Sequence, residues 1–281
     1  MSKEITLGLI QMSMSASAKE NREKAGRMIS EAAKKGAEIV CLPELFTSPY
    51  FCVNENPSFE YAEKFDAETN SFLREVAAKE NVFLVGGSIH EESAGKYYNT
   101  SAVIDNHGKV LGSYRKTHIP HDPCFYEQNY FLPGDTGFKV FQTAKAKISV
   151  LICYDQWFPE AARACALAGA DIIFYPTAIS TVDGVVEEEG NWQEAWENVQ
   201  RGHAIANNVI VAGVNRVGKE GSSNFWGGSF VCDAFGKTLI SGGKEEAVLI
   251  QKVDLEHSRK VREGWRFFYN RRPNVYQDIT K

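Results

Sequence analysis

An α/β fold is predicted for this chain, arranged as a four-layer αββα sandwich of two pseudo-symmetric halves. Two observations predict it. Apolar runs of strand length alternate with segments of helical periodicity, and the second half repeats the order and part of the sequence of the first. An α/β half covers one face of its sheet with its own helices. Two related halves can bury the remaining faces against each other, which gives four layers.

The first half opens with an apolar run of strand length, ITLGLI at 5–10. A helix is predicted over 18–35, and Gly36 ends its pattern. Its helical spacing is carried by Ala25, Met28, Ile29, Ala32 and Ala33. The next apolar run, AEIVCLP at 37–43, predicts a second strand.

A second helix and further strands are expected in the rest of the first half. The helix is marked by Phe72, Leu73, Val76 and Ala77. The run VFLVGGSI at 82–89 predicts a strand, and a pair of strands is expected at 101–105 and 109–115 around the turn DNHG. The predicted order is therefore strand, helix, strand, helix, strand, strand.

The repeat between the halves is visible in three blocks. They recur in the same order, at offsets between 127 and 133 residues. The pairs are GAEIVCLP at 36–43 with GADIIFYP at 169–176, NVFLVGG at 81–87 with NVIVAGV at 208–214, and SAVIDNHGKVLG at 101–112 with SFVCDAFGKTLI at 229–240. Three matches at nearly one spacing predict two related halves within a single domain over 1–281.

Composition restricts the class of protein and its partners. The chain has 281 residues, of which 43% are hydrophobic and 24% charged, as in soluble globular proteins. A net charge of −5 without a basic run argues against nucleic acid as a partner. The apolar runs are too short for a membrane helix. The N-terminus lacks a signal-peptide pattern, so we expect a cytoplasmic location.

The six cysteines contain no C-x-x-C pair, so neither a zinc site nor a disulfide framework is expected. Free thiols in a reducing compartment fit this pattern. The tail, defined as residues 257–281, combines aromatic residues and arginines with little periodicity. Such aromatic residues are costly to expose, and we expect the tail to pack on a partner subunit.

Three residues that could perform chemistry stand at the ends of predicted strands. Glu44 follows AEIVCLP, Lys116 ends KVLGSYRK, and Cys153 ends KISVLIC before a helix that Pro159 could open. Ligands of α/β sheets gather at the carboxyl ends of strands. In the second half the position of Glu44 is taken by Thr177. Related halves differ where function differs, so we expect one composite site.

These residue types fit an activated thiol that transfers an acyl group. An ammonium such as Lys116 favours the thiolate of Cys153, and Glu44 can accept its proton as general base. A strand-to-helix turn exposes the sulfur beside main-chain N–H groups that bind an oxyanion. A histidine base remains the chemical alternative, with His118 or His121 in the loop HIPHDP. Taken alone, each of the three residues has an ordinary structural interpretation.

The chain resembles the nitrilase superfamily of carbon–nitrogen hydrolases, with its Glu-Lys-Cys triad. The resemblance rests on LPELF around Glu44, YRKTHIP around Lys116 and CYDQWFPEAAR from Cys153. It implies an αββα fold, a thioester intermediate, no cofactor or metal, and a homo-oligomer. The family places a second glutamate in the site within a segment like FYEQNYFLPGD. Here that residue is Glu127.

Acidic residues in the loop STVDGVVEEEGN follow a predicted strand end and can lie over the same edge as Cys153. Such a cluster attracts a cation, although solvated acids or a favourable helix N-terminus explain it equally well. The acids are Asp183, Glu187, Glu188 and Glu189. Directly after Cys153, where YDQWF stands, no arginine is present to hold a substrate carboxylate. Tyr154 and Trp157 in this segment are candidate substrate contacts.

Within the superfamily, CYDQWFPEAARA and FYPTAI most resemble N-carbamoylputrescine amidases, which release ammonia and carbon dioxide from the ureido end of a diamine. The resemblance implies a small cationic ureido substrate and a place in polyamine biosynthesis. The alternative within the superfamily is a β-ureidopropionase-type hydrolase, whose substrate carboxylate would need a cation. The alternative that is not an enzyme is a catalytically silent nitrilase-like binding protein.

Overall fold

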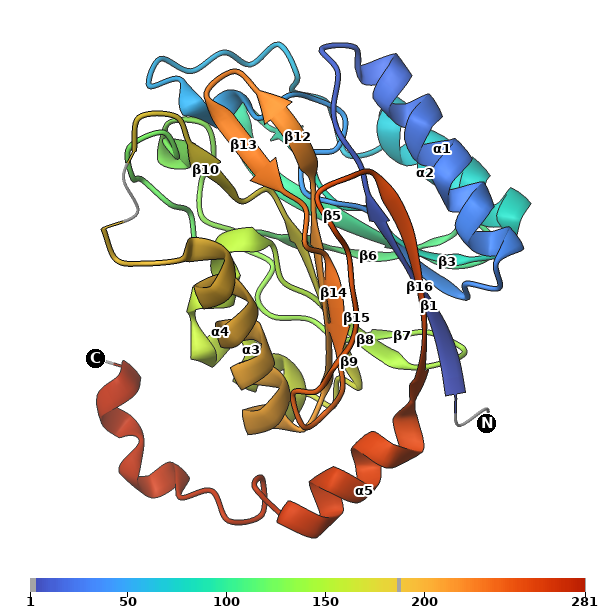
Figure 1. Ribbon diagram of the computed structural model, residues 1–281, viewed down its shortest axis with the longest axis vertical. Coiled ribbons are helices and arrows are strands. Elements are labelled where there is room, and N and C mark those ends of the chain that lie inside the picture. Colours follow the sequence, from blue (N-terminus) through green and yellow to red (C-terminus); the bar gives the residue numbers. More distant parts are fainter. Residues whose placement is uncertain (1–3, 186–187, 281) are drawn as a thin grey trace.

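The computed structural model describes residues 4–185 and 188–280, and their helices and strands form four layers (Figure 1). Helices α1 (Ala18–Lys34) and α2 (Glu68–Glu80) cover the outer face of one sheet, and α3 (Pro159–Leu167) and α4 (Trp192–Asn207) cover that of the other. The predicted αββα sandwich is confirmed.

The first sheet has the order β16-β1-β2-β3-β5-β4, with β6 also paired to β5. Strands β1, β2 and β3 run parallel, and their neighbours pair antiparallel. The strands are β1 (Glu4–Gln11), β2 (Ile39–Cys41), β3 (Phe83–Val85), β4 (Ile89–Ser93), β5 (Lys96–Ile104), β6 (Val110–Arg115) and β16 (Ala247–Asp254). Strand β16 comes from the end of the second half, so the two halves share this sheet.

The second sheet repeats this arrangement, with the order β7-β8-β9-β11-β14-β15. An antiparallel edge strand is followed by three parallel strands and then by antiparallel ones, as in the series β16-β1-β2-β3-β5-β6. The strands are β7 (Phe141–Gln142), β8 (Lys147–Val150), β9 (Ile172–Thr177), β11 (Ile210–Asn215), β14 (Phe230–Cys232) and β15 (Thr238–Ser241). The two halves are therefore pseudo-symmetric, as the repeat predicts.

Matching residues of the repeat perform matching structural tasks. Asn81 ends α2 and Asn208 ends α4, both in the left-handed conformation that asparagine tolerates. At the other ends, the side chains of Ser17 and Asn191 cap α1 and α4. No helix among the described residues is long and apolar enough to cross a lipid bilayer.

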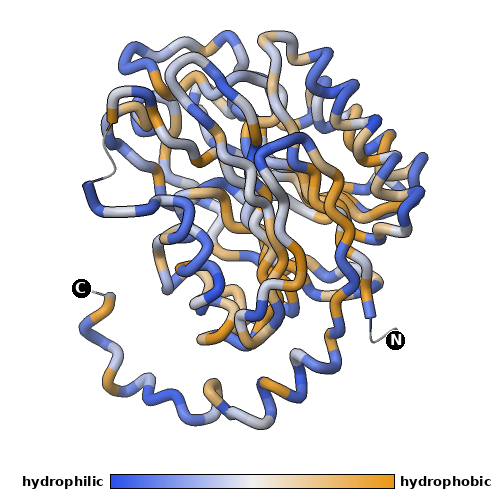
Figure 2. The backbone as a smooth tube through the Cα atoms, viewed as in Figure 1, coloured by the Kyte–Doolittle hydropathy of each residue, from blue (hydrophilic) through white to orange (hydrophobic). Residues whose placement is uncertain are grey.

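Strand side chains alternate between two apolar cores. The colouring of Figure 2 shows many hydrophobic residues along the strands in the interior of the molecule. In β1, Leu7 and Leu9 join the core between the sheets, whereas Ile10 joins the core under α1 and α2. A Cβ atom on Gly8 would lie 3.0 Å from that of Ala37. Each sheet is thus covered on both faces, as expected for strands with near-continuous apolar runs.

Two parts of the fold differ from the sequence prediction. The run 82–89 does not form one strand: β3 ends at Val85 and β4 begins at Ile89. Gly87 has a φ of +60°, and a Cβ atom there would lie 2.1 Å from the carbonyl oxygen of Pro43. This tertiary approach breaks the strand beside the turn that carries Glu44. A small sheet was also not predicted; it contains β10 (Ser180–Val182), β12 (Val217–Glu220) and β13 (Ser223–Trp226).

The tail extends along the outside of the molecule (Figure 1). It includes most of α5 (Leu255–Trp265) and the short helical turns η4 (Pro273–Val275) and η5 (Gln277–Thr280). The sequence showed little periodicity here, but Asp254 caps α5 by accepting bonds from the N–H groups of Glu256 and His257. Large apolar side chains of the tail are exposed: Trp265, Tyr269, Val275 and Ile279.

Candidate active site

The three residues predicted at strand ends converge at one end of the sandwich. Glu44 lies beyond β2, Lys116 directly follows β6, and Cys153 opens the short helical turn η3 (Cys153–Trp157) beyond β8. Glu44 and Lys116 are fully buried, and Cys153 is 7% exposed. Residues from both halves therefore meet in one place.

Lys116 binds two glutamates at once. Its Nζ atom donates to Glu44 Oε1 at 2.9 Å and to Glu127 Oε2 at 2.6 Å. Burial alone would lower the pKa of Lys116, but the negative charges of Glu127 and Glu44 outweigh burial and raise it well above its ordinary value. The ammonium group therefore stays charged between the two carboxylates.

Glu44 keeps one oxygen available. Its Oε1 atom accepts bonds from Lys116 and, at 2.7 Å, from Asn99 Nδ2. Its Oε2 atom is buried and has no hydrogen-bond partner among the described residues. An unpaired carboxylate oxygen is costly in a protein interior. This atom is suited to accept a proton from a neighbouring group.

Glu127 begins the short turn η2 (Glu127–Asn129). Its Oε1 atom accepts a bond of 2.8 Å from the hydroxyl of Tyr50. Burial, together with the charge of Glu44, raises the pKa of Glu127 above its ordinary value although Lys116 acts in the opposite direction. Tyr50 was not identified from the sequence. It lies 77 positions from Glu127, and no motif or periodicity around it indicates a contact between the two.

Cys153 occupies a sharp turn, with a left-handed φ of +43° that costs on the order of 1 kcal/mol for a residue other than glycine. Burial and the nearby carboxylate of Glu44 raise the pKa of its thiol well above the ordinary value, and Lys116 only partly opposes them. Lys116 therefore acts in the expected direction, because its charge lowers the thiol pKa, but burial and Glu44 outweigh it. The thiol rests protonated, so its activation needs a base.

Asp155 fixes this turn and was missed by the sequence analysis. Its Oδ2 atom accepts bonds from the N–H of Ile152 at 2.9 Å and from the hydroxyl of Tyr114 at 2.7 Å. Its Oδ1 atom binds the N–H and ring Nδ1 of His118, at 3.0 and 2.7 Å. The only sequence signal was an acid two residues after the candidate nucleophile.

The histidine alternative receives no support from this geometry. His118 is bound to Asp155, and its ring stacks on Phe158 with centroids 3.6 Å apart. Both His118 and His121 line a separate hollow that does not include Cys153. Their positions agree better with a role in shaping the loop.

Gln156 is held by side chains one turn apart on α4. Its Oε1 atom accepts bonds from Trp196 Nε1 at 2.7 Å and from Gln200 Nε2 at 3.1 Å. Because an indole N–H can only donate, the oxygen must face Trp196. The ring of His203 also contacts the main-chain carbonyl of Gln156 at 2.7 Å. Helix α4 therefore supports the turn that carries Cys153.

Glycine at 134 allows a loop to pass close to Lys116. The N–H of Gly134 donates to the carbonyl oxygen of Lys116 at 2.8 Å. A Cβ atom at this position would lie 2.1 Å from the carbonyl oxygen of Arg115. Larger side chains would push the loop away from the lysine strand.

Cys153 and Glu127 line a common cavity of about 480 Å³. The predicted contacts Tyr154 and Trp157 also line it. Its remaining wall consists of Tyr50, Pro120, Asp122, Pro123, Phe125, Gln156, Ala178, Ile179, Ser180, Val185, Glu189, Trp192 and Ala195. Among these described residues there are carboxylates but no lysine or arginine.

Only one of the described acidic residues of the loop at 180–191 lines this cavity. Glu189 lines it, and its Oε2 atom accepts a bond of 3.2 Å from Trp192 Nε1. Asp183 is instead bound to Lys219 and Asn224 at 2.7 Å each. Neither Asp183 nor Glu188 lines the cavity, so the structure gives no support to their assignment as substrate contacts. Glu187 lies outside the described residues.

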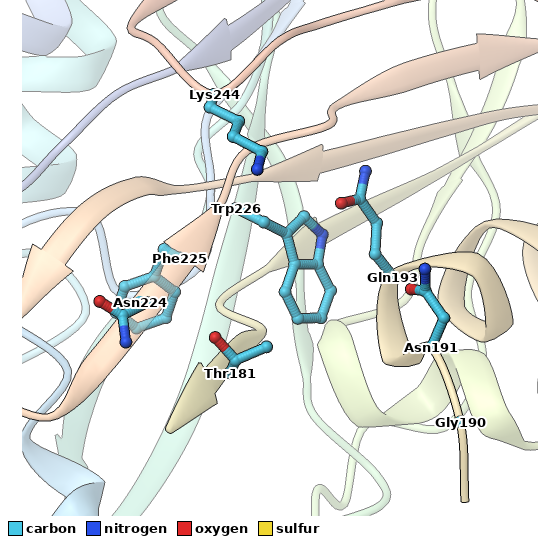
Figure 3. Close-up of a pocket in the computed structure, with 8 residues that line it drawn as sticks. All are labelled: Thr181, Gly190, Asn191, Gln193, Asn224, Phe225, Trp226 and Lys244. Atoms are coloured by element: carbon cyan, nitrogen blue, oxygen red, sulfur yellow. The ribbon is translucent and has the colours of Figure 1, made fainter. Parts of the chain in front are cut away.

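A second hollow, of about 510 Å³, lies beside this cavity around Trp226 (Figure 3). Lys244 lies on one side of the indole ring, and Gln193 and Asn191 of the α4 region lie on another. It contains none of the residues predicted to perform chemistry. Among the described residues, no group of three or more His, Cys, Asp or Glu side chains is arranged to hold a metal ion.

Comparison with known proteins identifies the family. The carbon–nitrogen hydrolase family model matches residues 6–263. N-carbamoylputrescine amidase of Solanum lycopersicum is 41% identical over 97% of this chain and 94% of its own length. Citrullinase of Francisella tularensis is 35% identical over 99% of this chain and 98% of its own length.

A solved structure agrees with this identification. The crystal structure of a carbon–nitrogen hydrolase from Helicobacter pylori G27 has a TM-score of 0.95 and 40% identity, and the match covers 99% of each chain. This chain belongs to the carbon–nitrogen hydrolases of the nitrilase superfamily and is an enzyme that hydrolyses carbon–nitrogen bonds of amides.

Proposed function

We propose that this enzyme hydrolyses the ureido group of N-carbamoylputrescine to putrescine, ammonia and carbon dioxide. The observation that carries this proposal is the cavity wall, whose described residues include Asp122 and Glu189, in addition to the Glu127 that pairs with Lys116, but no lysine or arginine. Such a wall favours a cationic substrate over an anionic one. The 41% identity to a plant N-carbamoylputrescine amidase supports the same substrate.

Cys153 is the proposed nucleophile and Glu44 its general base. The free oxygen of Glu44 accepts the thiol proton as the sulfur attacks the ureido carbon. A base is needed because the raised thiol pKa keeps Cys153 protonated at rest. The attack gives a tetrahedral intermediate whose oxygen carries the negative charge.

Lys116 and the N–H of Ala178 are the proposed stabilisers of that charge. The ammonium of Lys116 lies in the same buried cluster, and the N–H of Ala178 donates to the sulfur of Cys153. Glu44 then returns its proton to the departing ammonia, which leaves the carbonyl carbon bound to the sulfur of Cys153 and to the putrescine nitrogen, as a thioester of the carbamate type. Water activated by Glu44 hydrolyses this thioester and frees Cys153, and the resulting carbamic acid of putrescine loses carbon dioxide to give putrescine. Glu127 holds Lys116 in place.

The amine tail of the substrate is proposed to lie between aromatic rings and Glu189. Trp157 and Tyr154 supply apolar and π surface for a methylene chain that ends in an ammonium group. Glu189 supplies the opposite charge at the cavity wall. A β-ureidopropionase-type substrate would bring a carboxylate to this acidic wall, and a silent binding protein would have no need for the free oxygen of Glu44.

Substrate charge tests this proposal. We expect kcat/KM for N-carbamoylputrescine to exceed that for N-carbamoyl-β-alanine by at least about 100-fold, because the acidic wall repels a carboxylate. Ammonia release in steady state measures both. Faster turnover of N-carbamoyl-β-alanine would refute the polyamine substrate without affecting the hydrolase mechanism.

Neighbouring acids provide a matched pair of variants for the same test. Glu189→Gln is expected to raise KM for N-carbamoylputrescine roughly ten-fold. For pentylurea, an uncharged analogue, KM should stay within about two-fold of the parent value. Glu188→Gln is the control, because Glu188 does not line the cavity. Equal effects of the two variants would contradict direct recognition by Glu189.

We propose that the enzyme acts in polyamine biosynthesis in the cytoplasm. The six cysteines, all within the described part of the chain, form no disulfide bond, which is typical of a reducing compartment. We also propose that the chain forms a single hydrolase domain and assembles into a homo-oligomer. The tail is proposed to pack on a partner subunit of this oligomer. Its exposed aromatic and aliphatic side chains support this arrangement.

Replacing exposed tail aromatics should weaken this assembly. Trp265 and Tyr269 are 56% and 75% exposed in the single chain. We expect the double variant Trp265→Ser, Tyr269→Ser to lower the mass measured by light scattering across a dilution series. Leu132→Ser, another exposed apolar residue outside the tail, is the control. A monomeric parent, or an unchanged mass of the double variant, would contradict the proposal.

A further inference from the structure

Arg216 connects the second half of the molecule to the turn that carries Glu44. It follows β11 directly, and its side chain is fully buried. The guanidinium group reaches a turn of the first half more than 170 positions earlier in the sequence. A buried guanidinium requires hydrogen-bond partners, and these partners show what it holds.

One nitrogen of Arg216 binds two consecutive carbonyl groups. Its Nη2 atom donates to the carbonyl oxygens of Glu44 and Leu45, each at 2.8 Å. In an extended strand successive carbonyls point to opposite sides, so they cannot share one donor. They converge here because Leu45 has a left-handed φ of +48°. Ser88 completes the turn by accepting a bond from the N–H of Leu45 at 2.9 Å.

The other arm of Arg216 leads toward Glu127. Its Nη1 atom pairs with Glu220 at 2.8 and 2.9 Å. Glu220 Oε2 accepts a bond of 2.6 Å from the N–H of Tyr50, whose hydroxyl donates to Glu127 Oε1 at 2.8 Å. Both glutamates that bind Lys116 are therefore linked to the same buried guanidinium group.

We propose that Arg216 is a positioning residue that holds the Glu44 turn, and through Glu220 and Tyr50 also Glu127, in the geometry needed to activate Cys153. The inference rests on the catalytic roles proposed for Glu44 and Cys153. The planar fork of arginine is essential, because a single ammonium group cannot bind both consecutive carbonyls and Glu220 in one plane. Arg216 acts through these residues and does not line the cavity with Cys153.

Arg216→Lys tests this role because it keeps the charge and removes the fork. We expect kcat for N-carbamoylputrescine to fall about 10- to 100-fold with KM changed less than about three-fold, since a displacement of a catalytic group by about 1 Å can cost 100-fold. The rate of Cys153 alkylation by iodoacetamide should fall by a similar factor. This second readout needs no substrate, so it also tests the inference if N-carbamoylputrescine is not turned over.

Arg262 offers a matched control, because its Nη2 atom also donates to two main-chain carbonyls, those of Ala170 and Asn208, each at 3.1 Å. Arg262→Lys makes the same substitution in α5, at a partly buried arginine that binds two carbonyls through one nitrogen. We expect its kcat and its alkylation rate to stay within about two-fold of the parent. Equal losses in both lysine variants would overturn the proposal in favour of a general effect on folding.

Two further variants decide the remaining outcomes. A folded Arg216→Lys protein with unchanged kcat and unchanged alkylation overturns the proposal. If that variant does not fold, Glu220→Gln, which retains Arg216, is expected to lower kcat and the alkylation rate at least about three-fold, and no change in either would refute the proposal. Glu44→Gln is measured alongside these variants. Alkylation at the parental rate in that variant would refute the role of Glu44 in activating the thiol, as distinct from the role of Arg216.

Discussion

Cys153→Ala is expected to abolish amide hydrolysis, with kcat lower by at least about 10⁴-fold, because Cys153 is the one thiol among the described residues that line the cavity and can form the thioester. The side chain is only 7% exposed, so its loss also removes packing contacts beside the cavity that it lines. Ammonia release from N-carbamoylputrescine measures the activity, and thermal unfolding verifies that the variant is folded.

Cys165→Ala is the matched control for this substitution. Cys165 is also buried, and burial raises the pKa of its thiol to about 11. It lies on α3 and does not line the cavity with Glu127. The same loss of a thiol should therefore leave kcat within about two-fold of the parent value. Residual turnover above 1% in Cys153→Ala (roughly the 10²-fold loss expected of a merely assisting group) would contradict a nucleophilic role.

Glu44→Gln should lower kcat about 10²- to 10⁴-fold, the usual contribution of a general base. The amide keeps the size of the side chain but cannot accept the thiol proton at the free Oε2 position. Because Cys153 rests as a protonated thiol, its alkylation by iodoacetamide should slow as well. The fold should persist, since Lys116 still pairs with Glu127 at 2.6 Å.

The control for this loss is a carboxylate outside the site, and its pKa is raised. Burial is the main cause of the shift at Glu63, whose carboxylate accepts a bond from the N–H of Thr69 away from the cavity. Glu63→Gln should leave kcat nearly unchanged. If Glu44→Gln alkylates at the parental rate while its kcat falls, Glu44 serves a later step than thiol activation.

The layered fold and the convergence of strand ends could be predicted because both follow from local patterns. Apolar runs define the strands, helical spacing defines the helices, and the repeat with its shared Asn81 and Asn208 relates the halves. Polar residues at strand ends must then approach one edge. Glu44, Lys116 and Glu127 do lie within hydrogen-bonding distance there.

What depends on distant parts of the chain could not be predicted. The strand at 82–89 is broken by contact between Gly87 and Pro43, and the acids of the loop divide between Lys219 and the cavity. No periodicity marks these contacts, because they form between segments that are separated in sequence.

The sequence by itself determined the sandwich of two halves. It also determined which strand ends carry a carboxylate, an ammonium and a thiol. Both could be predicted because alternation, periodicity and repeats are properties of neighbouring residues. Only the tertiary structure decided that Cys153 rests protonated and that Arg216 binds the turn of Glu44. Desolvation and buried hydrogen bonds depend on everything that surrounds a group in space, and that surrounding exists only after the chain has folded.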